Sequence, residues 1–433
     1  NQPEFGFGDS PAFVLDTTNS GDNNGIDLEN PLATLDLSDP NALLAYTEAD
    51  GHDQVFFQFL DLNGDGNFSH EGEAWALSIE NGEPGTLIGG GETHSLFLNS
   101  DGTLRAMGKN NKGQLGDGTN VDRNSSVQAL NASDIAQVSA GTTHSLFLKS
   151  DGTVWGMGDN YKGRLGDGTV VDRNSPVQTL NASGVTQVAA GGSHSLFVKE
   201  DGTLWAMGDN YSGQLGDGTT SQRHSPVQVP NASGVTQVAA GGAHSLFLKD
   251  DGTLWAMGYN SLGPLGDGTT TNRNSPVQVA SDVVQVAAGG NHSLFVKNDG
   301  TLWAMGFNYF GQLGNGASGG PINSFDPSVS KKSPVQVSNA SGVVHVAAGK
   351  EFSLFIKNDG TLWAMGRNDD GQLGDGTTID RNTPVQVPDV SDVVQVSTGH
   401  YHSHFVKADG TLWAMGRNAD GQLGDGTTSQ RNS

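Results

Sequence analysis

The stretch from Asp61 to Glu73 carries the side chains best suited to bind a metal ion. Oxygen-bearing residues occur there at alternating positions, and they are Asp61, Asn63, Asp65, Asn67, Ser69, Glu71 and Glu73. Carboxylate, amide and hydroxyl oxygens around a sharp glycine turn are the ligands that a hard cation such as calcium requires. Phe68 adds an apolar anchor beside this loop. We therefore expect calcium to bind at these residues.

This segment resembles calcium loops of the EF-hand and dockerin type. It departs from them where Gly72 replaces the expected bidentate glutamate, with Glu71 and Glu73 on either side. The alternative is an acidic loop of Asx turns that holds no metal. A second acidic stretch, residues 16–27, is a weaker candidate and is better interpreted as a polar linker.

Histidine recurs in one slot of a repeated block and could in principle form a ring of metal ligands. The copies are His94, His144, His194, His244, His292 and His402, and Phe352 fills the same slot once. A transition metal needs its ligands within about 2.0 to 2.3 Å of one ion, whereas related positions in a ring of repeats are spread apart. We expect structural histidines that satisfy backbone groups within their own repeat.

Two further series recur with the same period. Aspartates of a Gly-Asp-Gly-Thr turn precede an arginine by six residues, as in Asp117 and Arg123, and Asn315 replaces the aspartate once. We expect these pairs to brace loops. Tryptophan and methionine recur two positions apart, as in Trp205 and Met207, which places both on one face of a strand and predicts packing between repeats.

The elements that carry these series form a repeat of about fifty residues. Successive histidine slots are separated by 50, 50, 50, 48, 60 and 50 residues. In the third copy, residues 185–190, 194–199, 204–207 and 226–229 have the alternating pattern of short strands. Pro226 favours the outer edge for the last of them. Four short strands with turns between them predict one blade of an all-β propeller.

The pattern A-A-G-G-x-H-S-L-F followed by D-G-T-L-W-A-M-G-x-N-x-x-G-Q-L-G-D-G-T closely resembles the regulator of chromosome condensation repeats. The resemblance implies a seven-bladed β-propeller of four-stranded blades. Members of that family include a guanine-nucleotide exchange factor for a small GTPase, a plant ultraviolet-B photoreceptor and a secreted bacterial β-lactamase-inhibitor protein. The photoreceptor's Gly-Trp-Arg-His-Thr type of run is absent from this chain, which argues against light sensing.

The register of the repeats predicts how the ring closes. The last copy stops where its outer strand should follow, and residues 74–79 alternate as a strand should. We expect Leu77 to Ile79 to complete the seventh blade and remove an open sheet edge. This divides the chain into an acidic segment with the calcium-type loop, residues 1–73, and a propeller, residues 74–433.

Composition excludes several classes of function. Asp and Glu exceed Lys and Arg by 47 to 22, a net charge of −25, which opposes binding to nucleic acid or anionic membrane. No apolar run is long enough for a membrane helix, and the chain has no Cys. It lacks H-E-x-x-H, G-x-S-x-G and phosphate-loop motifs, so we expect no enzyme. We expect a monomer.

Function is expected where the repeats differ. The fifth copy carries an insertion, residues 317–332, and several copies carry aromatic residues after M-G-x-N. From these we predict a protein-binding surface made of Tyr161, Tyr211, Tyr309, Phe310, Phe325, Lys331 and Lys332.

Our leading hypothesis is a non-enzymatic, macromolecule-binding propeller that is secreted or attached to a bacterial surface, because calcium loops of this kind suit extracellular calcium. The alternatives are an exchange factor for a small GTPase and a carbohydrate-binding lectin.

Overall fold

The computed structural model describes residues 88–99, 102–319 and 329–432, together with the backbone of five strands closer to the N-terminus. The chain forms two compact units, Asn1–Pro84 and Gly85–Ser433. The described residues contain no α-helix, and no helix among them is long and apolar enough to cross a membrane. The second unit is built from strands alone, as the alternating pattern of the repeats predicts.

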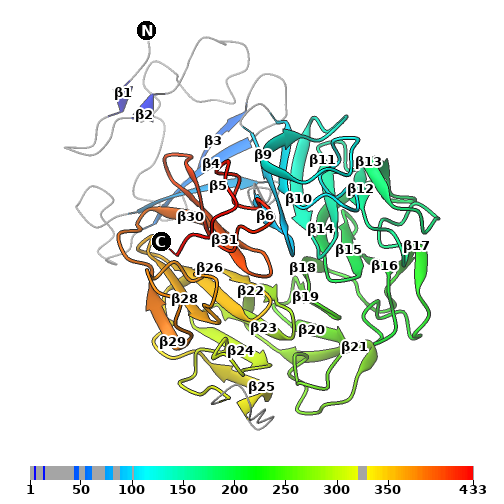
Figure 1. Cartoon of the computed structure of the whole chain (residues 1–433). Coiled ribbons are helices and arrows are strands. Elements are labelled where there is room, and N and C mark those ends of the chain that lie inside the picture. Colours follow the sequence, from blue (N-terminus) through cyan, green and yellow to red (C-terminus); the bar gives the residue numbers. More distant parts are fainter. Residues whose placement is uncertain are drawn as a thin grey trace. The chain divides into compact units, whose positions relative to one another are not determined.

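Seven sheets follow one another around a ring in the second unit, coloured from cyan through green and yellow to red (Figure 1). Blades one to three are β6 (Ile88–Gly90), β7 (His94–Leu98), β8 (Leu104–Gly108), β9 (Arg123–Gln128); β10 (Ile135–Ala140), β11 (His144–Lys149), β12 (Val154–Gly158), β13 (Arg173–Gln178); β14 (Val185–Ala190), β15 (His194–Lys199), β16 (Leu204–Gly208), β17 (Arg223–Gln228). Blades four and five are β18 (Val235–Ala240), β19 (His244–Lys249), β20 (Leu254–Gly258), β21 (Arg273–Ala280); β22 (Val283–Ala288), β23 (His292–Lys297), β24 (Leu302–Gly306), β25 (Lys331–Gln336). Blades six and seven are β26 (Val343–Ala348), β27 (Phe352–Lys357), β28 (Leu362–Gly366), β29 (Arg381–Gln386); β30 (Val393–Thr398), β31 (His402–Lys407), β32 (Leu412–Gly416).

Each blade is an antiparallel meander, and the seven-bladed propeller is confirmed. In the third blade, β14, β15 and β16 begin at the residues expected from the alternating pattern. The outer strand β17 begins three residues earlier than expected, at Arg223 instead of Pro226. The difference arises because Arg223 pairs with Gly208 beyond a register shift, which a strict alternation cannot reveal.

The core lies between blades. Leu204 and Val229 of the third blade pack with Phe247 and Met257 of the fourth, and all four are 0% exposed. The predicted packing role of the methionine series is therefore confirmed. The six tryptophans of the repeated slot are half-buried except Trp413, which is 53% exposed. Each stacks on a phenylalanine of the neighbouring strand, as Trp205 does on Phe197 at 6.1 Å.

The histidine series forms hydrogen bonds from one blade to the next. Nε2 of His194 lies 2.8 Å from Oγ of Ser245 in the following blade, and Ser245 Oγ donates to the carbonyl oxygen of Gln214. The same pairs are His94 with Ser145, His144 with Ser195, His244 with Ser293, His292 with Ser353, and His402 with Ser95. We expected each histidine to bond to backbone groups of its own blade. This expectation is wrong, because Nε2 of each ring bonds to a serine of the next blade.

These contacts also close the ring. His402 and Ser95 join the seventh blade to the first at 3.0 Å, and the backbone N–H of His400 donates to Gly91 at 3.0 Å. A one-residue bridge joins Gly416, the last residue of β32, to Arg431. Within the described part of the chain, the seventh blade thus has three full strands.

The N-terminal unit contains a short pair, β1 (Glu4–Phe5) and β2 (Phe13–Val14), and a sheet of β3 (Leu43–Thr47), β4 (Gln54–Leu60) and β5 (Ala74–Glu80). The strand expected at Leu77 to Ile79 is present as part of β5. It pairs with β4 along its length. The closure of the seventh blade by Leu77 to Ile79 stays a prediction.

Candidate functional site

One face of the propeller carries the largest departure from the repeat, the insertion in the fifth blade. It is formed by the turn between the first and second strands of each blade and by the long loop between the third and fourth. The two lie together because the N–H after each third strand donates to the turn, as from Asp159 to Thr143 O at 2.9 Å and from Arg367 to Glu351 O at 3.0 Å. We call this surface the long-loop face.

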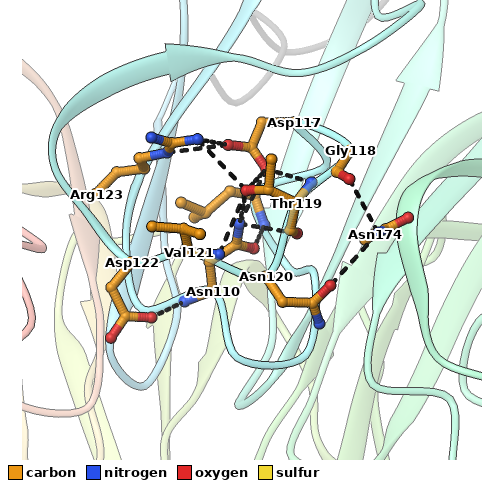
Figure 2. A network of polar contacts seen from close by, with 10 residues as sticks. Asn110, Asp117, Gly118, Thr119, Asn120, Val121, Asp122, Arg123 and Asn174 are labelled. Carbon is orange, nitrogen blue, oxygen red and sulfur yellow. Dashed lines mark hydrogen bonds and ion pairs between the residues drawn. The ribbon is translucent and has the colours of Figure 1, made fainter.

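Each long loop is held by a network of polar contacts, shown for the first blade in Figure 2. Asp117 Oδ1 accepts hydrogen bonds from Asn110 Nδ2 at 3.0 Å and from the Thr119 N–H at 2.9 Å. Asp117 Oδ2 accepts from Nε and Nη2 of Arg123 at 3.0 and 2.7 Å. Partial burial acts to raise the pKa of Asp117, but the hydrogen bonds from Thr119 and Arg123 outweigh it and lower that pKa. The loop is therefore a rigid support.

The predicted Asp–Arg loop braces are confirmed. The ion pairs join Asp117 to Arg123, Asp167 to Arg173, Asp217 to Arg223, Asp267 to Arg273, Asp375 to Arg381 and Asp425 to Arg431. The fifth blade replaces both partners, because Asn315 takes the place of the aspartate and Lys331 occupies the arginine register opposite Gly306. Lys331, which we predicted as a partner-binding residue, thus begins β25 and is half-buried, and Lys332 is exposed.

The predicted aromatic residues fall into two groups on the long-loop face. Tyr161 and Tyr211, in the second and third blades, are 71% and 85% exposed. Tyr309 and Phe310 lie together in the fifth blade with ring centroids 5.0 Å apart, and both are half-buried. The insertion residue Phe325 lies outside the described residues, as do the calcium-type ligands Asp61 to Glu73.

A cluster of charged and aromatic side chains around Tyr401 was not predicted from the sequence. Three cations lie over its ring, with Lys350 Nζ, Arg367 Cζ and Arg417 Cζ at 4.9, 5.2 and 5.7 Å from the centroid. Lys350 Nζ also donates to the Tyr401 hydroxyl at 2.6 Å. Arg367 lies 5.1 Å from the ring of Phe310, which joins the predicted aromatic pair to this group. We call these five residues the Tyr401 cluster.

The Tyr401 cluster is fixed by ion pairs. Arg367 pairs with Glu351 at 2.7 Å and with Asp369 at 3.1 Å. Desolvation is the largest single influence and acts to lower the pKa of Arg367, but the hydrogen bond from Arg367 to Glu351 and the attraction of Glu351 and Asp369 together outweigh it and raise that pKa. The guanidinium is therefore held in place over two rings.

A signal for this cluster was present in the sequence. The turn that reads Gly-Gly-Ser in the third repeat and Gly-Gly-Ala in the fourth becomes Gly-Lys-Glu at Gly349 to Glu351 and Gly-His-Tyr at Gly399 to Tyr401. Comparing the copies position by position would have singled out both turns. Lys350 and His400 also line the end of the central channel, among the glycines of the other turns.

Comparison with known proteins agrees with the fold and the repeat. The RCC1-like domain family matches residues 120–433, and the regulator of chromosome condensation (RCC1) repeat matches residues 86–114. The chain belongs to the RCC1-like domain family. No curated protein matches the chain.

Solved structures show the same propeller. The yeast RCC1 protein Prp20 bound to Kap60 is 23% identical, with a TM-score of 0.67 over 77% of this chain and 83% of that one. Saccharomyces cerevisiae Prp20p, whose structure is described with its binding to Gsp1p and histones, is 23% identical, with a TM-score of 0.68 over 78% and 86%. Human WBSCR16 is 25% identical, with a TM-score of 0.64 over 77% and 89%.

Proposed function

We propose that the chain is a non-enzymatic propeller that binds another protein through its long-loop face, with the Tyr401 cluster as the centre of the contact. The observation that carries the proposal is that aromatic and arginine side chains gather in one sector, the fifth to seventh blades, of an otherwise repetitive ring. Tyr and Arg are the residues that most often dominate protein interfaces. A scaffold role alone would not require this sector to differ.

Capture of partners by the intact chain tests this proposal. The double variant Phe310→Ser/Tyr401→Ser should lose a partner that the wild type retains, with binding weakened by about tenfold or more. Asp251→Ser/Asp299→Ser is the matched control, because these exposed aspartates lie in turns at the opposite ends of the strands. Equal capture by both variants and the wild type would remove the Tyr401 cluster from the interface.

Exchange activity on a small GTPase is the second candidate, and membership of the RCC1-like domain family favours it. It is separated from simple binding by nucleotide release. Faster release from a small GTPase at catalytic amounts of the protein, lost in Phe310→Ser/Tyr401→Ser, would assign exchange to the long-loop face. Unchanged release across a panel of GTPases leaves binding as the function.

We further propose that the protein acts outside a bacterial cell and that Asp61 to Glu73 bind calcium there. The oxygen-rich residue pattern and the strongly acidic composition support this proposal. Calorimetry of the intact chain should show binding at millimolar calcium, and Asp61→Asn/Asp65→Asn should abolish it. Wild-type and variant proteins that take up no calcium would contradict both the site and the extracellular assignment based on it.

A further inference from the structure

The three cations of the Tyr401 cluster differ in how their charge is balanced. Arg367 is neutralised by Glu351 at 2.7 Å and by a second carboxylate at 3.1 Å. Lys350 and Arg417 have no carboxylate within ion-pair distance among the described residues. Both side chains are half-buried. Two positive charges therefore lie beside one tyrosine ring without a described carboxylate to neutralise them.

Other lysines of the long-loop face are paired. Lys109, Lys112 and Lys162 lie 3.4, 3.0 and 2.7 Å from an aspartate of a neighbouring blade. Glu92, in the turn of the first blade, is directed to a different group, because its Oε1 lies 3.6 Å from His400 Nδ1. The two unpaired cations in the sixth and seventh blades are thus a local departure from the way this face balances its charges.

Three side chains meet at this point as hydrogen-bond donors. Lys350 Nζ donates to the Tyr401 hydroxyl at 2.6 Å, so the hydroxyl oxygen is an acceptor there and its own proton remains to be donated. No described group accepts from the Arg417 guanidinium, whose Nε is buried without a partner. Ammonium and guanidinium groups contain no acceptor. Since a buried donor without an acceptor costs free energy, the arrangement lacks one kind of partner, an acceptor with negative charge.

A flat aromatic surface lies beside these donors. Arg367 Cζ lies 5.2 Å from the centroid of the Tyr401 ring and 5.1 Å from that of Phe310, so its guanidinium joins the two rings. Its charge is already balanced by Glu351. Aromatic rings and a neutralised guanidinium offer a planar surface for apolar side chains. A ligand that fits the whole cluster therefore combines one anionic group with a neighbouring apolar group.

We propose that the Tyr401 cluster binds an anionic side chain of its protein partner, a carboxylate or a phosphate. Lys350, Arg417 and the Tyr401 hydroxyl donate to this group, and an apolar side chain of the same segment packs against Phe310. This inference rests on the proposed function of the long-loop face and adds the chemistry of the partner. Charge-assisted hydrogen bonds are about twice as strong as neutral ones, so the anion determines which segments bind.

Extended polyanions fit the cluster less well. The net charge of −25 repels nucleic acid and anionic membranes from the rest of the surface. Glu351 and Asp369 flank Arg367 within the cluster itself. The two remaining cations therefore accommodate one anionic group and not a row of them.

Selection of random peptides displayed on phage against the intact protein tests the proposal. The enriched peptides should share an acidic residue next to an apolar one. Arg417→Gln/Lys350→Gln should bind the selected peptide at least about tenfold more weakly than the wild type does. Lys112→Gln/Lys162→Gln is the matched control and should bind it normally. Each double variant removes two lysine or arginine charges, so a difference between them reports the cluster and not the total charge.

Replacing the acidic residue of the selected peptide identifies the anionic group. Glutamine in its place should weaken binding about tenfold, measured by fluorescence anisotropy. Tighter binding of a phosphoserine version would assign the site to a phosphate, and tighter binding of the glutamate version to a carboxylate. The proposal is overturned if the glutamine peptide binds as well as either, if no peptide is enriched, or if the two double variants bind equally.

Tyr401→Phe keeps the proposal testable if the double variant does not fold. It removes one donor and leaves the ring in place, and it should weaken peptide binding about threefold or more. The chemistry and the interface can fail separately. A partner that is lost by Phe310→Ser/Tyr401→Ser but retained by Arg417→Gln/Lys350→Gln would keep the long-loop face as the interface and overturn only its anionic ligand.

Discussion

Mild acid is expected to unfold the propeller, with the steepest loss of stability between pH 6.5 and about 4. Burial lowers the pKa of His94 and His194 to about 4 and of His244 and His292 to about 3. Desolvation also places the pKa of His144 and His402 well below the ordinary value. All six side chains are 0% exposed.

The geometry of the interface explains why these rings must be neutral. The serine hydroxyl has one proton and donates it to a backbone carbonyl, as Ser245 does to Gln214 O. Its oxygen must therefore accept from His194 Nε2–H. Nδ1 is then unprotonated, and it has no hydrogen-bond partner among the described residues. A second proton would create a buried charge with nothing to compensate it.

The sign of the pH effect follows from these shifts. The six histidines bind protons near pH 6.5 in the unfolded chain but not in the folded chain. The stability that depends on neutral histidines is therefore complete above pH 6.5, and it declines as the pH falls toward the pKa values of the folded state. Each histidine contributes a slope of about 1.4 kcal/mol per pH unit to the free energy of unfolding, and the six together contribute at most about 8 kcal/mol per pH unit. Since domains are stable by about 5 to 15 kcal/mol, one or two pH units should suffice to unfold this one.

Thermal unfolding from pH 7.5 to 4 measures the effect. His244→Phe should reduce the slope by one proton, because Phe352 shows that this slot accepts a phenyl ring and Ser293 keeps its bond to Pro264 O. The exposed His224→Asn is the matched control and should leave the slope as it is. A midpoint that stays constant down to pH 4.5 would refute the assignment of neutral buried histidines.

Most of the propeller could be predicted because every blade repeats the same local signals. The alternation of β14 and β15 and the Asp-Gly turn after them act over a few residues, and seven copies reinforce one another. The Asp217 to Arg223 brace was predictable for the same reason, since both partners lie in one loop. Local periodicity therefore determines the blade.

Contacts between blades were harder to predict because the partner is one repeat away. The histidine slot was recognised as structural, but the serine it reaches belongs to the next copy, and spacing within one repeat cannot show this. The Tyr401 cluster likewise brings together Phe310, Arg367 and Tyr401 from three blades. Its members stand out only when substitutions in consecutive copies are placed on the same face.

Gly258→Ala is expected to destabilise the propeller by about 2 to 5 kcal/mol, through backbone strain and overpacking. Gly258 ends β20 with φ at +108°, a conformation that side chains disfavour. A Cβ there would lie 2.7 Å from the carbonyl oxygen of Ala243 and 2.8 Å from Cα of His244. Both are backbone atoms of the paired strand and its turn, so no side-chain rotation can relieve the contact.

Gly218→Ala separates the two causes. Gly218 also has a positive φ, +81°, but nothing lies within 4 Å of an added Cβ. It should therefore lose only the conformational cost of about 1 to 2 kcal/mol. Guanidinium unfolding, compared at equal m-values, gives both losses. Equal losses of stability in the two variants would mean that the turn at Ala243 moves to accommodate the new methyl group. The close approach of strand and turn would then not explain why glycine occupies this position in every blade.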